Sequence, residues 1–415
     1  MLGIGLGFLI LIILITLKIN IVVAAPVAAT IIAVVNDLNI LQVMNEFYLP
    51  GFGDFIQSYL FIFLLSAMLG QIIESSQDAD YISDFVVEVL NYKYMAVGIF
   101  FTSALLGLGG ISAFVLIFSI YPIADRVFEK VGLSQSLILA AVGGGIVVIA
   151  IPLPGSPQIH NLIMMDFLNN TAVTGLVMGV VSVLVGTVFS AGYLFYRTRN
   201  LLDEESLEKA NSVFNKPEPD KLKNFLISIS PLLLVFTMLA FFDLPPVLAL
   251  ASGVVLSMVK NIRKIKVTKI INDSISQASI PMLFAASAMG FGEVISNLPV
   301  FTEFLQVLLN LPLHPLILVG VINNMAAGLL GTASGGMLLT LSTVGEELAQ
   351  SLDSASLHRI FLIGATGLDT LPHNSAYLAM LSFTGLTLKE TYRDYFVITV
   401  LAPLLMLVTA LIIAL

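Results

Sequence analysis

Residues 153–161 read LPGSPQIHN and lie inside an apolar stretch that runs from about residue 134 to 168. This stretch is too long for one straight membrane helix. Pro152, Pro154 and Pro157 each lack the N–H that a helix interior uses, so we expect them to break the helix within the membrane. Backbone that is opened at membrane depth is tolerated only where it is buried in protein or lines a polar cavity. The stretch therefore predicts a broken helix beside a polar site.

The rest of the chain matches this membrane setting. Of its 415 residues, 58% are hydrophobic and 11% are charged, and the mean hydropathy is +1.00. Cysteine is absent, which excludes a disulfide framework and a thiolate metal site. The first apolar run has no cationic leader, since its first positive charge is Lys18, and we expect a true span there. Runs long enough to cross about 30 Å of hydrocarbon lie at about residues 2–18, 20–36, 51–73, 171–196, 223–243, 245–260, 272–294 and 394–415.

Three less regular apolar stretches complete the pattern. Residues 356–384 resemble the first broken stretch and carry Pro372 at their break. The other two, at about 94–124 and 312–343, contain Gly109-Gly110 and Gly335-Gly336, where we expect the chain to turn. Each arm has about 15 residues, or about 22 Å of helix, which suits a re-entrant hairpin better than two full crossings.

Short motifs recur in the same order in the two halves of the chain. Ser66-Ala67-Met68 returns as Ser287-Ala288-Met289, Leu105-Leu106-Gly107 as Leu329-Leu330-Gly331, and His160-Asn161 as His373-Asn374. Amphipathic connectors precede both hairpins, with Ile82, Phe85, Val86, Val89 and Leu90 in the first and Phe301, Phe304, Leu305 and Leu308 in the second. We divide the chain into a first repeat, 1–198, a cytoplasmic linker, 199–222, and a second repeat, 223–415.

These halves define the expected fold. Each holds five crossings and one hairpin, and because five is odd the second half enters the membrane with opposite polarity. We predict an all-α polytopic membrane protein built from two inverted repeats, each of five transmembrane helices plus one re-entrant hairpin, with broken helices at the midplane. Inverted repeats with broken helices are typical of secondary transporters.

Positive charges set the expected orientation. Among the 18 Lys and Arg residues, only Arg359 falls on the outer side if both termini are outside and the loop 197–223 is cytoplasmic. This asymmetry indicates a multi-pass protein of the plasma (inner) membrane. It does not distinguish a re-entrant hairpin from two full spans, because both return the chain to the same side.

Several motifs resemble the gluconate permease family. They are LPGSPQIHN at 153–161, LPHNS at 371–375, Gly109-Gly110 followed by Phe114-Val115 and Tyr121-Pro122, and KETYRD at 389–394, and the resemblance covers about residues 1–415. It implies a proton-coupled importer of gluconate or a related hydroxy or amino carboxylate, often dimeric, in an ion-transporter superfamily of paired hairpins and broken helices. Met164 and Met165 stand where the family pattern has Pro-Thr, so the substrate of the better-known members does not carry over directly.

We expect the polar breaks to hold the substrate, a small organic anion. Half-helix N-termini, hydroxyls and amides suit a hydroxylated carboxylate, and this topology places no Lys or Arg at the midplane. The candidate substrate-binding residues are Gly109, Gly110, Ser112, Ser156, Gln158, His160, Asn161, Thr332, Ser334, Gly335, His373, Asn374 and Ser375.

Proton coupling requires a group that titrates at membrane depth, and Asp369, His373 and His160 are the candidates. The alternative for Asp369 and His373, four residues apart, is that they only satisfy each other and cap a broken helix. Asp166, Glu74 and Glu293 fit solvated positions at span ends. His314 and His358 fit structural positions at extracellular edges.

Other function classes remain open or are excluded. A sodium-coupled carboxylate symporter and a sodium/proton antiporter are the alternatives, although an antiporter requires a buried acidic pair and only Asp369 is convincingly central. An enzyme is not expected, because no G-x-S-x-G or H-E-x-x-H motif occurs. The basic loop at 260–270 is a topology signal and not a nucleic-acid site. We expect no cofactor and no metal, and the partners are the substrate, a proton or sodium, the lipid bilayer and a second copy in a homodimer.

Overall fold

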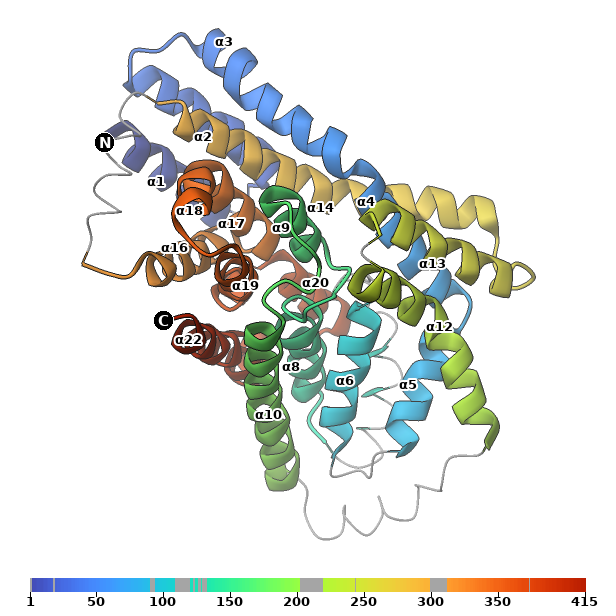
Figure 1. Ribbon diagram of the computed structural model, residues 1–415. Coiled ribbons are helices and arrows are strands. Elements are labelled where there is room, and N and C mark those ends of the chain that lie inside the picture. The colour runs from blue at the N-terminus through green and yellow to red at the C-terminus, as the bar shows by residue number, and fades with distance from the viewer. Residues whose placement is uncertain are drawn as a thin grey trace.

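A computed structural model describes residues 2–17, 19–89, 94–108, 120–121, 124–125, 128, 133–201, 219–242, 244–298, 312–372 and 374–415 (Figure 1). No β-strand occurs in these ranges. The helices of the first half are α1 (Leu2–Thr16), α2 (Ile21–Val35), α3 (Ile40–Gln42), the π-helix η1 (Val43–Tyr48), α4 (Leu49–Ser75), α5 (Asp78–Val89), α6 (Met95–Gly107), α8 (Ser136–Gly144), the π-helix η3 (Gly145–Ala150), α9 (Ile159–Leu168) and α10 (Leu176–Leu201).

The helices of the second half follow a polar linker. They are α12 (Pro219–Phe241), α13 (Pro246–Asn261), α14 (Val267–Ser296), α16 (Pro315–Leu330), α17 (Ala333–Thr340), the π-helix η4 (Leu341–Gly345), α18 (Glu346–Ser351), α19 (Ser354–Gly364), the 3₁₀ turn η5 (Leu368–Thr370), α20 (Ser375–Thr384), α21 (Leu388–Phe396), the π-helix η6 (Val397–Leu401) and α22 (Ala402–Ala414).

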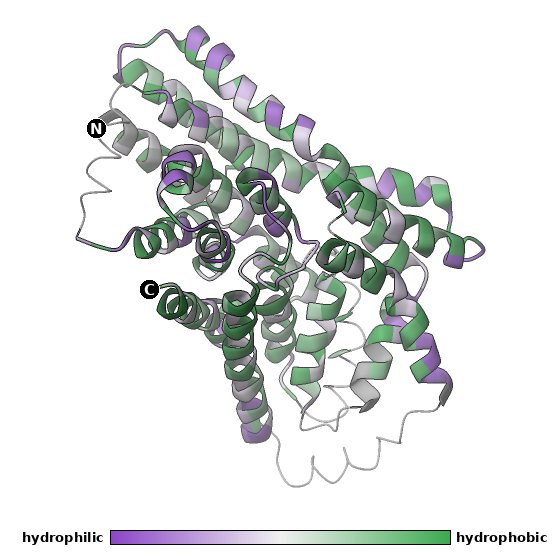
Figure 2. Ribbon diagram, viewed as in Figure 1, coloured by the Kyte–Doolittle hydropathy of each residue, from purple (hydrophilic) through white to green (hydrophobic). Residues whose placement is uncertain are grey.

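Five of the described helices are long and apolar enough to cross a membrane, namely Ile40–Ser75, Leu176–Leu201, Asp220–Leu239, Val267–Ser296 and Leu388–Ala414. Hydrophobic residues run along most helices, and hydrophilic residues gather mainly at helix ends and loops (Figure 2). Large apolar side chains in mid-helix also face outward, for example Val188 at 71% and Val255 at 59% exposure. Such surfaces are stable in lipid and not in water, so the fold is that of a multi-pass membrane protein.

The first two expected spans form shorter helices than the others. Helices α1 and α2 have 15 residues each, or about 22 Å at the usual rise, and they pack against each other. Asn20 caps the start of α2 by accepting a hydrogen bond from the Val22 N–H at 3.0 Å. Asn36 ends α2, and its side chain donates to the Ile32 carbonyl at 2.8 Å. Polar caps therefore set both ends of α2.

Corresponding elements follow one another in the same order in the two halves. A long helix (α4, α14) precedes the helix predicted as the first arm of a hairpin (α6, α16), a broken helix (α8–α9, α19–α20) and a final long segment (α10, α21–α22). Helix α4 packs along α14, and α10 packs along α22 (Figure 1). Helix α13 lies on α4 as α2 lies on α14. The two broken helices consequently occupy matching places in the order of elements.

The second hairpin turns at a different point from the one predicted. Helix α16 ends at Gly331, which has a left-handed φ of 62°, and α17 begins at Ala333. Gly335 and Gly336 instead lie inside α17, the returning arm. A Cβ on Gly336 would lie 2.2 Å from backbone atoms of Ala327 in α16. The prediction of a turn at Gly335-Gly336 is therefore wrong, because glycine serves close helix packing there. The corresponding turn at Gly109-Gly110 lies outside the described residues.

This packing predicts that Gly336→Ala destabilises the protein although alanine favours helix. The added methyl group would overlap backbone, which cannot move as a side-chain end can, so we expect a loss of about 1 to 3 kcal/mol or more. Gly53→Ala is the control, because a Cβ at this α4 position meets no atom within 4 Å. Thermal unfolding in detergent measures both variants. Equal transition temperatures for the two would contradict the packing of α16 on α17.

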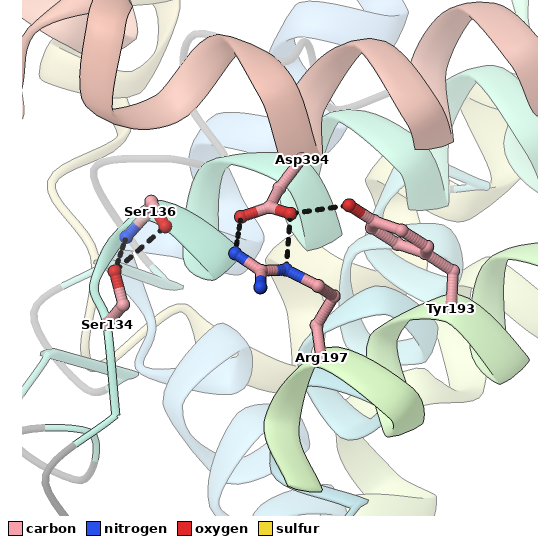
Figure 3. A network of polar contacts seen from close by, with 5 residues as sticks. All are labelled: Ser134, Ser136, Tyr193, Arg197 and Asp394. Carbon is pink, nitrogen blue, oxygen red and sulfur yellow. Dashed lines mark hydrogen bonds and ion pairs between the residues drawn. The ribbon is translucent and has the colours of Figure 1, made fainter. Parts of the chain in front are cut away.

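Polar contacts join distant helices outside the broken region. Arg197 of α10 forms a bidentate ion pair with Asp394 of α21, with Nε–Oδ1 at 2.7 Å and Nη2–Oδ2 at 3.0 Å, and Tyr193 donates to the same carboxylate at 2.6 Å (Figure 3). Asp78 at the start of α5 pairs with Lys260 of α13 at 2.8 Å. Both pairs connect the first half to the second.

Candidate functional site

The first break begins where the π-helix η3 ends at Ala150 and finishes where α9 begins at Ile159. Gly155 adopts a φ of 83°, which a residue with a Cβ rarely takes up. The Ser156 hydroxyl donates to the Ala150 carbonyl and accepts from the Gln158 N–H at 3.2 Å. The Pro-rich segment therefore interrupts the helix, as the sequence predicts, and hydrogen bonds of Ser156 fix its conformation.

A carboxamide in each break bonds to the end of a hairpin arm. The Gln158 side chain donates to the Gly107 carbonyl at the end of α6. The Asn374 side chain donates to the Gly331 carbonyl at the end of α16, at 2.9 Å. Gly107 and Gly331 are the equivalent glycines of the Leu-Leu-Gly motif. The structure thus joins each break to the hairpin arm of its own half.

The two repeated asparagines brace their breaks in the same way. Asn161 donates to the Ser156 carbonyl and Asn374 to the Asp369 carbonyl, both at 2.8 Å and both five residues back. Asn161 is fully buried, and it also donates to the Ala172 carbonyl at 3.3 Å. Asn374 accepts the N–H of Tyr377 at 2.7 Å. Both amides therefore fix backbone that proline and glycine have freed from helical bonding.

Asp369 lies in the second break, inside the 3₁₀ turn η5. Its side chain is 5% exposed, and one carboxylate oxygen accepts the N–H of Gly367 at 2.8 Å. Among the described residues, no Lys or Arg forms an ion pair with it. Thr370 donates to the carbonyls of Gly367 at 2.8 Å and Thr399 at 3.1 Å. A buried carboxylate without a cationic partner is costly when charged, which fits a group that binds a proton.

The remaining predicted residues are placed as follows. Thr332 and Ser334 are half-buried at the start of α17, with their hydroxyls 3.3 Å apart, and Gly335 is buried beside them. His160 is buried in α9, and its Nδ1 has no partner in the described part of the chain. Ser375 begins α20, although its side chain is not described. Gly109, Gly110, Ser112 and His373 lie outside the described residues.

His358 and Arg359 lie in the core of the protein. Both are fully buried in α19. The His358 ring contacts the side-chain oxygens of Asn161 and Asn170, at 2.9 Å each, through Nε2 and Nδ1 respectively. Because the Asn161 amide nitrogen donates to two carbonyls, its oxygen faces the ring, and His358 Nε2 is the donor. The first break is therefore held in part by residues of the second half of the chain.

Sequence reasoning also missed Asn323 and Asn324 on α16. Asn324 donates to the carbonyls of Gly364 at 3.0 Å and Thr366 at 2.6 Å, at the end of α19. Asn323 donates to the Phe361 carbonyl at 2.7 Å. An Asn-Asn pair inside an apolar run was the signal that could have found them, since buried amides in membrane helices need partners.

The two breaks belong to one packed region. Helix α9, which leaves the first break, contacts both α17 and α19 of the second half. No group of three or more His, Asp or Glu residues within the described ranges is arranged to hold a metal ion. The arrangement offers backbone N–H groups at helix starts, hydroxyls and amides, and no recognisable catalytic group. It suits reversible binding of a polar solute.

A family model described as GntP family permease matches residues 1–245, more than half of the chain. The chain belongs to the GntP permease family. The resemblance inferred from the Pro-rich and His-Asn motifs is thereby confirmed. Relatives in the GntP permease family are named as transporters or permeases, so this chain is a membrane transporter for a small molecule and not an enzyme.

Individual relatives of this GntP family permease cover most of its length. It is 25% identical to an uncharacterized transporter of Bacillus subtilis, YxjC, over 92% of each chain. It is 22% identical to an uncharacterized permease of Haemophilus influenzae, over 80% of this chain and 75% of the relative. Its fold is similar to that of the Alcanivorax borkumensis YdaH transporter, which has an unusual topology. The TM-score is 0.53 at 14% identity, covering 88% of this chain and 86% of that one.

Proposed function

We propose that this permease is a proton-coupled symporter that takes up a small organic anion, such as gluconate or a related hydroxy or amino carboxylate. The observation that carries the proposal is the matched pair of asparagine braces, Asn161 and Asn374, each fixing the backbone of its break, while Gln158 and Asn374 bond the two breaks to the ends of α6 and α16. Paired breaks of this kind are the usual substrate sites of secondary transporters. A solute that binds between the two breaks would explain why polar backbone is buried at both of these matching points.

Three short helices supply the proposed anion contacts. Helices α9, α17 and α20 begin at Ile159, Ala333 and Ser375, directly after the breaks and the hairpin turn. Free N–H groups at such starts attract anions, and the hydroxyls of Thr332 and Ser334 add donors for substrate oxygens. Asn161, Gln158 and Asn374 already donate to protein carbonyls, so we assign them to positioning the breaks, with Ser156. The other proposed contacts are Gly109, Gly110, Ser112, His160, Gly335, His373 and Ser375.

Counterflow in proteoliposomes tests transport without assuming any coupling ion. Vesicles are loaded with one unlabelled compound, and entry of labelled gluconate is followed. Gluconate and small hydroxy and amino carboxylates should drive entry, whereas glucitol, which replaces the carboxylate of gluconate by a hydroxymethyl group, should not. If none of the carboxylates drives exchange above protein-free vesicles, the proposed substrate class is wrong.

A sodium-coupled carboxylate symporter is the second candidate, favoured by one observation. The side-chain oxygens of Asn323 and Asn324 are buried without hydrogen-bond partners in the described part of the chain. Both asparagines lie beside the end of α19, close to the second break. Buried carbonyl-type oxygens are ligands for hard cations. Replacing sodium by potassium in the uptake assay distinguishes the two candidates, because only a sodium-coupled carrier should lose accumulation.

The proposal includes the orientation and symmetry expected from the sequence. The termini would lie outside, the loop 197–223 in the cytoplasm, and the two halves would form inverted repeats in the inner membrane, with two copies forming a homodimer. Support comes from the distribution of the 18 Lys and Arg residues and from the corresponding order of helices in the two halves.

Cysteine labelling in cells checks this orientation, because the native chain has no cysteine. A cysteine introduced next to Lys266 should react with a membrane-impermeant thiol reagent only after the cells are opened. A cysteine next to Asp353, which caps α19, should react in intact cells. The opposite pattern, or labelling of both sites in intact cells, would overturn the inverted-repeat model.

A further inference from the structure

Arg359 is a buried cation near the first break, in a space that residues of the first half shape. Arg359 is fully buried and is the largest such side chain in the described part of the chain. Two glycines of the first half make room for its stem. A Cβ on Gly175, whose φ is 68°, would lie 2.6 Å from Arg359 Cγ, and one on Gly179 would lie 3.1 Å from Cδ. The same Cβ on Gly179 would lie 2.5 Å from Pro154 Cγ, so the arginine stem packs beside the first break.

Backbone carbonyls orient the guanidinium group. Its Nε donates to the Thr174 carbonyl, and Nη2 donates to the Ala172 carbonyl at 2.8 Å. These two bonds occupy the edge of the planar group formed by Nε and one N–H of Nη2. The opposite edge, formed by Nη1 and the second N–H of Nη2, matches a carboxylate in bidentate geometry. Nη1 is buried and has no hydrogen-bond partner among the described residues.

The Ala172 carbonyl connects this arginine to the substrate region. It accepts not only Arg359 Nη2 but also the Gly155 N–H at 2.8 Å and the Asn161 side chain at 3.3 Å. Gly155 and Asn161 both belong to the first break. The guanidinium and the polar backbone of the first break, to which we assign substrate binding, therefore donate hydrogen bonds to the same carbonyl oxygen.

Charge balance indicates what completes this site. Burying an ionised guanidinium is costly unless an anion compensates it, and carbonyl dipoles compensate it only in part. The ion pairs recorded among the described residues, Arg197–Asp394 and Lys260–Asp78, do not include Arg359. Its neighbour His358 donates to Asn161 and supplies no negative charge. The described part of the chain thus provides a pre-oriented cation without a counter-ion of its own.

We propose that Arg359 binds the carboxylate group of the transported anion through Nη1 and the free N–H of Nη2. This inference rests on the proposed function and names a residue that sequence reasoning excluded from the site. Nη1 is covered by protein in this conformation, so the carboxylate reaches it when the first break moves during the transport cycle. The alternative is a purely structural arginine that holds residues 172–174 against α19.

Equilibrium binding of gluconate to the purified full chain separates these roles. Arg359→Gln should weaken gluconate binding roughly 10- to 150-fold, because a charge-assisted pair is lost. Arg359→Lys keeps the charge without the planar fork and should fall between the wild type and Arg359→Gln. The control is Arg197→Gln, which removes another arginine whose carboxylate partner is protein, Asp394, and should lower stability while leaving gluconate affinity unchanged.

The thermal shift produced by ligand keeps the test valid if stability changes. Acetate, a small carboxylate probe, and gluconate should each raise the unfolding temperature of the wild type and of Arg197→Gln, but not that of Arg359→Gln. If Arg359→Gln does not fold, Arg359→Lys carries the test, and wild-type affinity in it overturns the proposal. Wild-type gluconate affinity in folded Arg359→Gln also overturns it while leaving the proposed function intact. Failure of every carboxylate to bind the wild type overturns both.

Discussion

Replacing Asp369 by asparagine is expected to abolish the accumulation of substrate driven by a pH gradient, while exchange of substrate across the membrane continues. The side chain is buried, and the asparagine oxygen can still accept the Gly367 N–H that the carboxylate accepts at 2.8 Å. The amide cannot bind and release a proton, however, so the carrier cannot use the gradient. Exchange returns the loaded carrier without resetting its protonation. Accumulation should fall to the level of protein-free vesicles.

Asp166→Asn is the matched control for this experiment. Asp166 is an exposed acid on α9 that accepts a hydrogen bond from Tyr59 at 2.8 Å, outside both breaks. It should keep full accumulation. His373→Gln should be as severe as Asp369→Asn if the histidine carries the proton, and milder if the histidine only tunes the acid. Full pH-driven accumulation in Asp369→Asn would make that acid structural and would shift the proton-binding role to His160 or the coupling to sodium.

Replacing Asn161 by alanine is expected to weaken both substrate binding and the folded state. The variant loses bonds to the Ser156 and Ala172 carbonyls and to His358, all in a fully buried environment. Each buried group left without a partner costs about 1 to 3 kcal/mol. Because the brace fixes the first break, we expect substrate affinity to fall roughly 10- to 150-fold. Asn374→Ala should do the same at the second break, where the bonds to Gly331 and Asp369 are lost.

Asn170→Ala separates the brace from the histidine contact. Asn170 also contacts His358, at 2.9 Å, but it lies in the loop after α9 and is only partly buried. Its replacement should change gluconate affinity little. Thermal unfolding and equilibrium binding are measured on all three variants. Near-normal affinity in both Asn161→Ala and Asn374→Ala would move the substrate site away from the breaks.

Local chemistry explains why the breaks could be read from the sequence. Proline removes a backbone donor, and glycine permits the left-handed conformations seen at Gly155 and Gly367, so both breaks fall where LPGSPQIHN and LPHNS predict them. The equivalence of Asn161 and Asn374 also followed from repeated motifs, and the structure gives both the same bond to a carbonyl five residues back.

Contacts between distant segments explain what the sequence did not show. Nothing in residues 356–364 indicates that His358 and Arg359 reach the first break, because their partners lie 185 to 197 residues earlier in the chain. The sequence predicts a turn at Gly335-Gly336, but glycine serves both conformational freedom and close packing, and the sequence alone does not distinguish the two. The substrate contacts of the site stay predictions for the same reason, since they depend on tertiary geometry around the breaks.

Concentrative uptake tests the central claim most directly. Labelled gluconate, or the best carboxylate found by counterflow, is added to proteoliposomes that contain the full chain and are acidic outside. The account predicts accumulation above the external concentration, collapse of that accumulation when a proton ionophore is added, and no dependence on sodium. Entry that only equilibrates across the membrane under the same gradient, or accumulation that survives the ionophore, would contradict proton-coupled symport.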